Sequence, residues 1–244
     1  MTNINKRVVI QCSGGVESTI LLAMACKERG AENVYPIVYR STSVFWVNRD
    51  STATKRALTN LGLNDKAFYC DIANSDMLEY PRDAMFEDVG FIPGYKLIMN
   101  ANALSYAQKV GASEVWVGNM ADNVYPDESQ SFMDRLVSLY NDTYTQAGSC
   151  LTDPIRIVQQ FAGLSKSQVI SQGYEILGDV IFDTLSCGDE RTAGGYNCGI
   201  CPWCQKRRAG FKYALGFDNT PYLYSGSDNF QNLCWVSKNK GDSK

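Results

Sequence analysis

Short runs of β-branched and aromatic residues alternate along the chain with longer segments in which apolar residues recur every three or four positions. The short runs predict buried strands over residues 7–12, 34–39, 67–72 and 114–118. The longer segments predict helices over residues 16–29, 51–61, 97–110, 131–144 and 165–178. Because these helices alternate with the strands, the pattern predicts an α/β fold, a parallel sheet with helices on both faces.

The turn after the first predicted strand is the place where this fold would bind a ligand, because such sheets bind ligands at the carboxyl ends of their strands. It reads Ser13-Gly-Gly-Val-Glu-Ser18 and leads into the first helix. Its two glycines let the backbone approach a ligand closely, and its amide groups together with the helix dipole favour an anion. The pattern differs from the G-x-x-x-x-G-K-[ST] and G-x-G-x-x-G loops, which disfavours those nucleotide-binding classes.

Four of the nine cysteines fall within eighteen residues near the end of the chain. Cys187, Cys198, Cys201 and Cys204 have the spacing of a tetrahedral Zn²⁺ site, with Gly199 in a tight turn between ligands. A shell of four thiolates leaves no open position for water, so the metal is expected to be structural. The alternative is a redox pair or scattered free thiols. We therefore expect an α/β domain over residues 1–184 and a metal-binding lobe with a tail over residues 185–244.

Composition excludes several kinds of chemistry. The chain has 244 residues and no histidine, so imidazole bases, Ser-His and Cys-His nucleophiles and His-ligated metals are ruled out. A net charge of −3 makes binding to nucleic acid unfavourable overall. No apolar run reaches membrane-spanning length and no signal-peptide profile is present, and reduced cysteines fit a cytoplasmic location.

The residues quoted so far, with others, resemble a known family. Ser13–Ser18 looks like the SGG-x-D-S loop of the PP-loop ATP pyrophosphatases, whose fold is that of the adenine nucleotide alpha hydrolases. The rest resembles the 7-cyano-7-deazaguanine (preQ0) synthases over about residues 7–222. The matching residues are Ile92-Pro93-Gly94, Gly118-Asn119, Asp122, Tyr125-Pro126-Asp127, Phe132 and the cysteine block through Arg207 and Phe211.

The resemblance implies a function in 7-deazapurine and queuosine biosynthesis. ATP would activate the carboxylate of 7-carboxy-7-deazaguanine as an adenylate, ammonia would give the amide, and a second ATP would lead to the nitrile. Because glutamine hydrolysis usually needs a Cys-His pair, ammonia would be free or come from a separate amidotransferase. The resemblance also implies a homodimer.

The same resemblance suggests roles for individual residues. The pyrophosphate would bind Ser13, Gly14, Gly15 and Ser18, and Gly118 and Asp71 would contribute to the nucleotide site, although Asp71 could instead cap a turn. Glu17 would face Mg²⁺ or orient the loop; the alternative is an acidic residue that favours the helix dipole. Lys96 would offset charge at the adenylate or lie in solvent. Asp122, Tyr125 and Asp127 would bind the base, although Asp127 could instead cap the next helix. Arg207 would support the metal loop or a phosphate, or form a peripheral salt bridge.

Four departures from the family pattern bear on the acceptor. Glu17 replaces an aspartate, residues 39–42 differ from a Y-G-Q-x-H stretch, Tyr95-Lys96 replaces an R-N pair, and the segment from Asp122 to Tyr125 is one residue shorter. Three alternative functions therefore stay open. They are a ligase that stops at the amide or uses another carboxylate, including a protein terminus; a PP-loop tRNA sulfurtransferase that uses Cys12, Cys70 or Cys150; and a zinc-ribbon interaction module.

Overall fold

A computed structural model of the chain describes most of its length. The described residues are 6–40, 45–72, 94–121, 125–146, 154–188 and 196–224.

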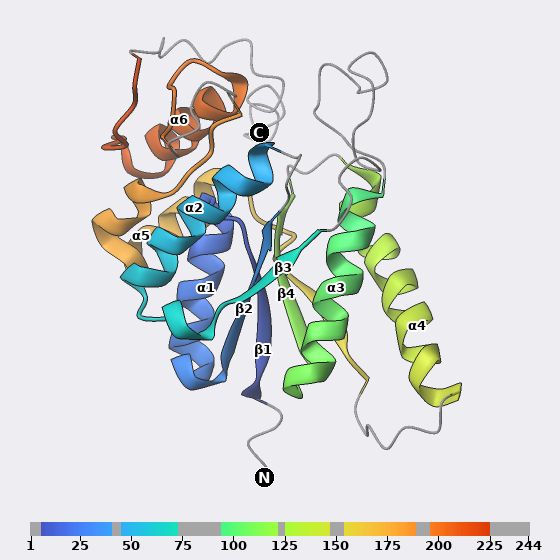
Figure 1. Cartoon of the computed structure of the whole chain (residues 1–244). Coiled ribbons are helices and arrows are strands. Elements are labelled where there is room, and N and C mark those ends of the chain that lie inside the picture. Colours follow the sequence, from blue (N-terminus) through green and yellow to red (C-terminus); the bar gives the residue numbers. More distant parts are fainter. Residues whose placement is uncertain are drawn as a thin grey trace.

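The centre of the molecule is a parallel sheet (Figure 1). Its strands are β1 (Val8–Cys12), β2 (Val34–Arg40), β3 (Phe68–Asp71), β4 (Glu114–Met120) and β5 (Arg156–Phe161). They lie in the order β3-β2-β1-β4-β5, and every neighbouring pair is parallel. The chain proceeds from β1 to β3 on one side and then returns to add β4 and β5 on the other side of β1. The switch point, where such sheets bind ligands, therefore lies between β1 and β4.

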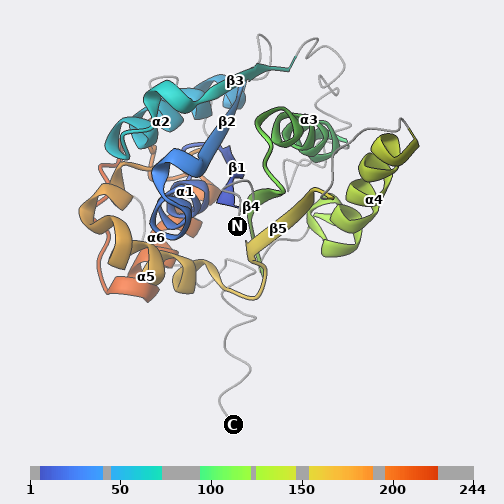
Figure 2. The same ribbon diagram turned by 90° about the horizontal axis from the view of Figure 1, so that it is seen from below.

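Helices cover both faces of the sheet (Figure 2). On one face lie α1 (Val16–Arg29), α2 (Phe45–Asn60) and α5 (Lys166–Leu177), and α6 (Pro202–Leu215) packs against α5. On the other face lie α3 (Tyr95–Val110) and α4 (Gln130–Gln146). Each face has its own apolar core, one centred on Ile20, Trp116 and Phe211 and the other on Leu104, Val115 and Met133. The predicted α/β fold with a two-sided parallel sheet is confirmed.

Some elements differ from the sequence-based expectation. The strand predicted at residues 67–72 exists, but the prediction that it is buried is wrong, because β3 is an edge strand and Phe68 is 37% exposed. The polar residues Arg156 and Gln159 interrupt the apolar pattern of β5, which was not predicted. The helix predicted from residue 51 begins at Phe45. The sequence analysis predicted no separate helix within the metal-binding lobe, where the structure has α6.

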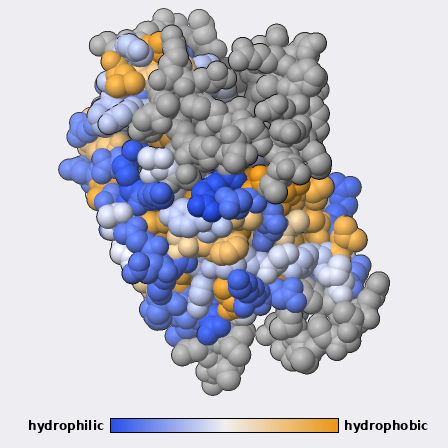
Figure 3. Space-filling view, viewed as in Figure 1, coloured by the Kyte–Doolittle hydropathy of each residue, from blue (hydrophilic) through white to orange (hydrophobic). Residues whose placement is uncertain are grey.

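Hydrophilic side chains, with hydrophobic ones between them, cover much of the face that Figure 3 shows. None of the helices in the described part of the chain has both the length and the hydropathy that a membrane crossing needs.

Candidate functional site

The loop of residues 13–18 (the phosphate loop) joins β1 to α1 at the switch point of the sheet. Its two ends are held together by serines: the Ser13 amide donates to Ser18 Oγ at 3.2 Å, and the two hydroxyl oxygens also lie 3.2 Å apart. Gly15 precedes the first turn of α1, and no side chain caps the helix. The loop thus combines amides, hydroxyls and a helix N-terminus in the arrangement that binds phosphate.

Two glycines allow neighbouring elements to pack closely against this loop. Gly14 has φ +70°, and a Cβ there would lie 2.4 Å from the backbone nitrogen of Thr54 in α2. A Cβ on Gly118, in β4, would lie 3.2 Å from Cβ of Glu17. The structure therefore brings Gly118 to the phosphate loop, although the two are far apart in sequence.

Glu17 forms an ion pair with a residue that the sequence analysis did not identify as functional. Lys166 Nζ lies 2.5 Å from Glu17 Oε1, and both side chains are largely removed from solvent. Burial raises the pKa of Glu17, but the charge and hydrogen bond of Lys166 outweigh this, and the pKa lies below its usual value. Glu17 is therefore ionised at neutral pH, and the pair places a carboxylate and an ammonium beside the phosphate loop.

Lys166 carried a signal in the sequence that was available but not used. It is the first residue of α5, where the helix dipole disfavours a cation. A capping box of Ser165 and Gln168 fixes this first turn. Gly210 of α6 leaves room for the lysine, because a Cβ there would lie 3.2 Å from Lys166 Cγ.

Asp71 lies at the end of β3 and is bound by an arginine of the neighbouring strand. Arg40 Nε and Nη2 donate to the two carboxylate oxygens of Asp71, each at 2.8 Å. The Asp71 side chain is 70% exposed. Arg40 therefore already binds the carboxylate that was predicted to contribute to the nucleotide site, and the pair lies at the carboxyl edge of the sheet.

Asp127 is a buried carboxylate whose oxygens have no hydrogen-bond partner among the described residues. It is 6% exposed, and neither oxygen has a partner within hydrogen-bonding geometry. Burial raises its pKa, opposed by the charge of Lys96 and by the backbone amides of Asp127 and Lys96. The hydroxyl of Ser129 accepts from the Phe132 amide at 3.3 Å at the start of α4. The helix-cap interpretation of Asp127 is therefore wrong.

The other predicted acceptor residues lie beside Asp127 or outside the described residues. Lys96 does not extend freely into solvent but pairs with Glu128 at 3.3 Å. Burial raises the pKa of Tyr125, and the neighbouring Glu128 and Asp127 add to the effect. Asp122 lies outside the described residues.

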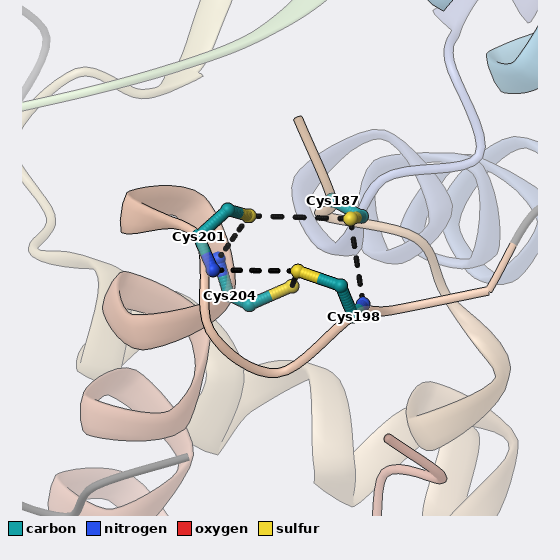
Figure 4. A group of neighbouring side chains, drawn as sticks. All are labelled: Cys187, Cys198, Cys201 and Cys204. Carbon is teal, nitrogen blue, oxygen red and sulfur yellow. Dashed lines mark hydrogen bonds between the residues drawn. The ribbon is translucent and has the colours of Figure 1, made fainter. Parts of the chain in front are cut away.

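The four predicted metal-binding cysteines come together (Figure 4). Their sulfur atoms all lie within 4.8 Å of one another, and the Cys187–Cys201 and Cys198–Cys204 pairs are 3.9 Å apart. A tetrahedron with Zn–S bonds of about 2.3 Å has edges of about 3.8 Å, so the four thiols fit Zn²⁺. Backbone amides also point at the sulfurs, for example that of Ile200 at Cys198 Sγ, 3.4 Å away. Gly199 has φ +89°, as the predicted turn requires.

Arg207 follows the last cysteine on α6 and is fully buried. Its hydrogen-bond acceptors among the described residues are neutral oxygens: the hydroxyls of Thr184, Ser186 and Thr220 and the carbonyls of Ile181 and Phe182. Its interpretation as a peripheral salt bridge is wrong.

A sequence model described as "Queuosine biosynthesis protein QueC" matches residues 7–215. The 7-cyano-7-deazaguanine synthase of Ralstonia nicotianae is 30% identical over 234 residues, which cover 89% of this chain and 99% of that protein. The Legionella pneumophila synthase is 31% identical over 229 residues, 89% of this chain and 97% of that protein.

Solved structures resemble the chain more weakly. NMN synthetase from Francisella tularensis aligns with a TM-score of 0.37 and 15% identity, over 72% of this chain and 65% of that one. The U34-tRNA thiolase NcsA from Methanococcus maripaludis aligns with a TM-score of 0.41 and 11% identity, over 87% of this chain and 71% of that one. At these scores neither structure supports an argument about function. The sequence match covers most of the chain, and the protein belongs to the queuosine biosynthesis protein QueC family.

Proposed function

We propose that this protein is an ATP-dependent C–N ligase that converts 7-carboxy-7-deazaguanine and ammonia into 7-cyano-7-deazaguanine. The observation that carries the proposal is the phosphate loop at the switch point between β1 and β4, with the Glu17–Lys166 pair beside it, in a chain of this family. The curated relatives in Ralstonia and Legionella bear the name of that synthase.

The nucleotide half of the site would bind ATP through its phosphates. The amides and hydroxyls of Ser13, Gly14, Gly15 and Ser18 would bind the pyrophosphate portion, with Gly118 underneath the loop. Lys166 would neutralise charge as pyrophosphate leaves. Glu17 would direct the lysine at the loop through their ion pair, and it would offer a carboxylate oxygen to Mg²⁺, which would neutralise phosphate charge.

The reaction follows from the poor leaving ability of a carboxylate oxygen. Attack of the substrate carboxylate on the α-phosphorus of ATP forms an acyl-adenylate and releases pyrophosphate. Ammonia then displaces AMP and gives the amide. A second ATP adenylates the amide oxygen, and loss of AMP with two protons leaves the nitrile. Positioning and charge neutralisation are sufficient for these steps, which suits a chain without histidine.

The acceptor half of the site would use Asp127, with Tyr125 and Asp122 close to it in sequence. A buried carboxylate with no hydrogen-bond partner in the described part of the chain matches a base that presents adjacent N–H donors, as a deazaguanine does. Lys96 would offset charge at the adenylate, and its pairing with Glu128 fixes it beside Asp127. This pairing supports a positioning role at the acceptor.

The proposal extends to partners and compartment. Ammonia would enter free or from a separate amidotransferase, and the protein would act as a homodimer in the cytoplasm. No disulfide joins the cysteines that the structure describes, which agrees with a reducing compartment. The four clustered cysteines would hold Zn²⁺.

Sulfur transfer to tRNA is the second candidate function, and it needs a reactive thiol outside the metal site. Burial raises the pKa of Cys12 far above its usual value and also raises the pKa of Cys70. Thiols that stay protonated are poor nucleophiles, so these two cysteines favour the ligase. Cys150 lies outside the described residues.

The proposal is tested by Glu17→Gln, with Glu28→Gln on the exposed side of the same helix as its control. We expect Glu17→Gln to lower the rate of AMP and pyrophosphate release by about 100-fold or more, the effect of losing one preorganised charge. The circular dichroism spectrum should be unchanged in both variants. Wild-type pyrophosphate release by Glu17→Gln would contradict the role of Glu17.

A further inference from the structure

The phosphate loop and the four-cysteine site share one short piece of chain, residues 184–187 (the bridging segment). Near its middle, the Leu185 amide donates to the Gly14 carbonyl of the phosphate loop at 2.9 Å. At its end, Cys187 supplies one of the four clustered thiols. Only one residue separates Leu185 from Cys187, so any displacement of the cysteine is transmitted to the backbone that holds the loop.

The rest of the metal lobe holds the same segment from the other side. Asn197, next to Cys198, donates to the Thr184 carbonyl at 3.0 Å and accepts from the Ser186 amide at 2.9 Å. Leu185 packs in one apolar cluster with Ala53 and with Cys187, Cys198 and Cys204. Ala53 in turn faces Gly14, where a Cβ would lie 2.5 Å from its side chain. The packing is therefore continuous from the cysteines to the loop.

Arg207 joins the two parts of the metal lobe. It lies one helical turn after Cys204 on α6, and its guanidinium donates to Thr184 Oγ1 at 2.8 Å and to Ser186 Oγ at 3.3 Å. It also donates to the carbonyls of Ile181 and Phe182, just before the bridging segment. A single side chain thus connects the helix that carries Cys201 and Cys204 with the segment that carries Cys187.

The charge of Arg207 also requires explanation, because a fully buried cation normally has an anionic partner. Within the described ranges, no carboxylate lies within ion-pair distance of it. Burial lowers the pKa of the guanidinium, and the charges of Tyr222 and Asp218, followed by those of Cys204 and Glu17, oppose this. Four thiolates around a divalent cation carry two net negative charges, so a loaded metal site would add to the negative charge that Asp218 and Glu17 place near the guanidinium.

We propose that Arg207 is a positioning residue that couples the metal site to the phosphate loop through the bridging segment, so that metal binding and ATP binding strengthen each other. The ATP part of this inference rests on the proposed function. The coupling itself concerns this chain's own residues and can be measured without turnover.

The test compares Arg207→Met with Lys212→Met, which removes the same charge from an exposed position on the same helix. Thr184→Val, which removes one acceptor of Arg207 at nearly constant volume, covers the case in which Arg207→Met does not fold. Hydrogen exchange by mass spectrometry follows the peptides of residues 12–18 and 184–188 and, for reference, those of β4 and β5. Chelator competition gives the rate of Zn²⁺ release, and calorimetry with Mg-ATP alone gives the Kd.

We expect Arg207→Met, and wild type depleted of zinc, to exchange faster in both the loop and bridging peptides but not in β4 and β5. Arg207→Met should release Zn²⁺ about tenfold faster than Lys212→Met and bind ATP about tenfold more weakly, a usual size for coupling between sites. Thr184→Val should show the same pattern to a smaller extent.

Loop exchange that is the same with and without zinc, or uniformly faster exchange across the sheet, would overturn the coupling. Zinc-loaded wild type that binds no ATP would instead contradict the proposed function, while the exchange measurement would still decide the coupling.

Discussion

At the residue scale, Asp127 is a carboxylate that the fold keeps at the expense of stability. Its pKa in the folded state is raised, so its protonated form is favoured by folding and its charged form is disfavoured. A raised folded pKa contributes stability below the ordinary pKa of aspartate, and this contribution is lost as the pH rises through the folded pKa. At neutral pH the buried charge therefore destabilises the protein, which is typical of a residue kept for binding.

Asp127→Asn tests this interpretation. We expect a higher midpoint of urea unfolding than wild type at pH 7, with the difference shrinking as the pH falls toward 4. In the same variant the KM for the acceptor should rise by about tenfold or more, because asparagine replaces one of the two accepting oxygens with an NH2 donor, while the KM for ATP stays the same. Asp65→Asn, at an exposed position, is the control. A less stable Asp127→Asn at pH 7 would contradict the account.

At the element scale, α2 and β4 pack on the phosphate loop because glycine leaves the space. Gly14 and Gly62 have similar backbone angles, φ +70° and +67°, but only Gly14 is crowded; nothing lies within 4 Å of a Cβ on Gly62. Gly62→Ala should lower the free energy of unfolding by about 1 kcal/mol, because alanine is strained at this backbone conformation, and it should leave the affinity for ATP unchanged. Gly14→Ala should lower the free energy of unfolding by about 1–3 kcal/mol more than Gly62→Ala does, because the added methyl group would overpack against α2. This variant should also bind ATP poorly. Equal losses in urea unfolding would show that the contact with α2 does not matter.

The apolar periodicity was sufficient to predict β1, β2 and β4, the edge strand β3 and five of the helices. It failed for β5, because Gln159 in that strand makes a contact with a distant part of the chain: its amide donates to the Glu128 carbonyl at 2.9 Å.

The domain boundary between residues 184 and 185 stays a prediction. Phe211 of α6 lies in the same core as Ile20 of α1, so the two parts pack as a unit.

At the scale of the whole molecule, the cysteine cluster and the phosphate loop were predictable because each is a local pattern of spacing. The Glu17–Lys166 pair was not, because it joins residues 149 positions apart and depends on how α5 packs beside α1. The same holds for Arg207, whose partners lie up to 26 positions away and include backbone carbonyls, which sequence patterns do not reveal. The fold therefore supplies the charged groups around a loop that the sequence already specifies.

The central claim is that this site uses ATP to convert a deazaguanine carboxylate into a nitrile. Its most direct test is mass spectrometry of the zinc-loaded protein incubated with ATP, Mg²⁺, ammonium and 7-carboxy-7-deazaguanine, with AMP and pyrophosphate measured in parallel. We predict the amide and then the nitrile, with two AMP released per nitrile formed. Release of AMP and pyrophosphate without any change in the base would contradict 7-carboxy-7-deazaguanine as the acceptor. The absence of AMP would contradict the proposed ATP-dependent reaction as a whole.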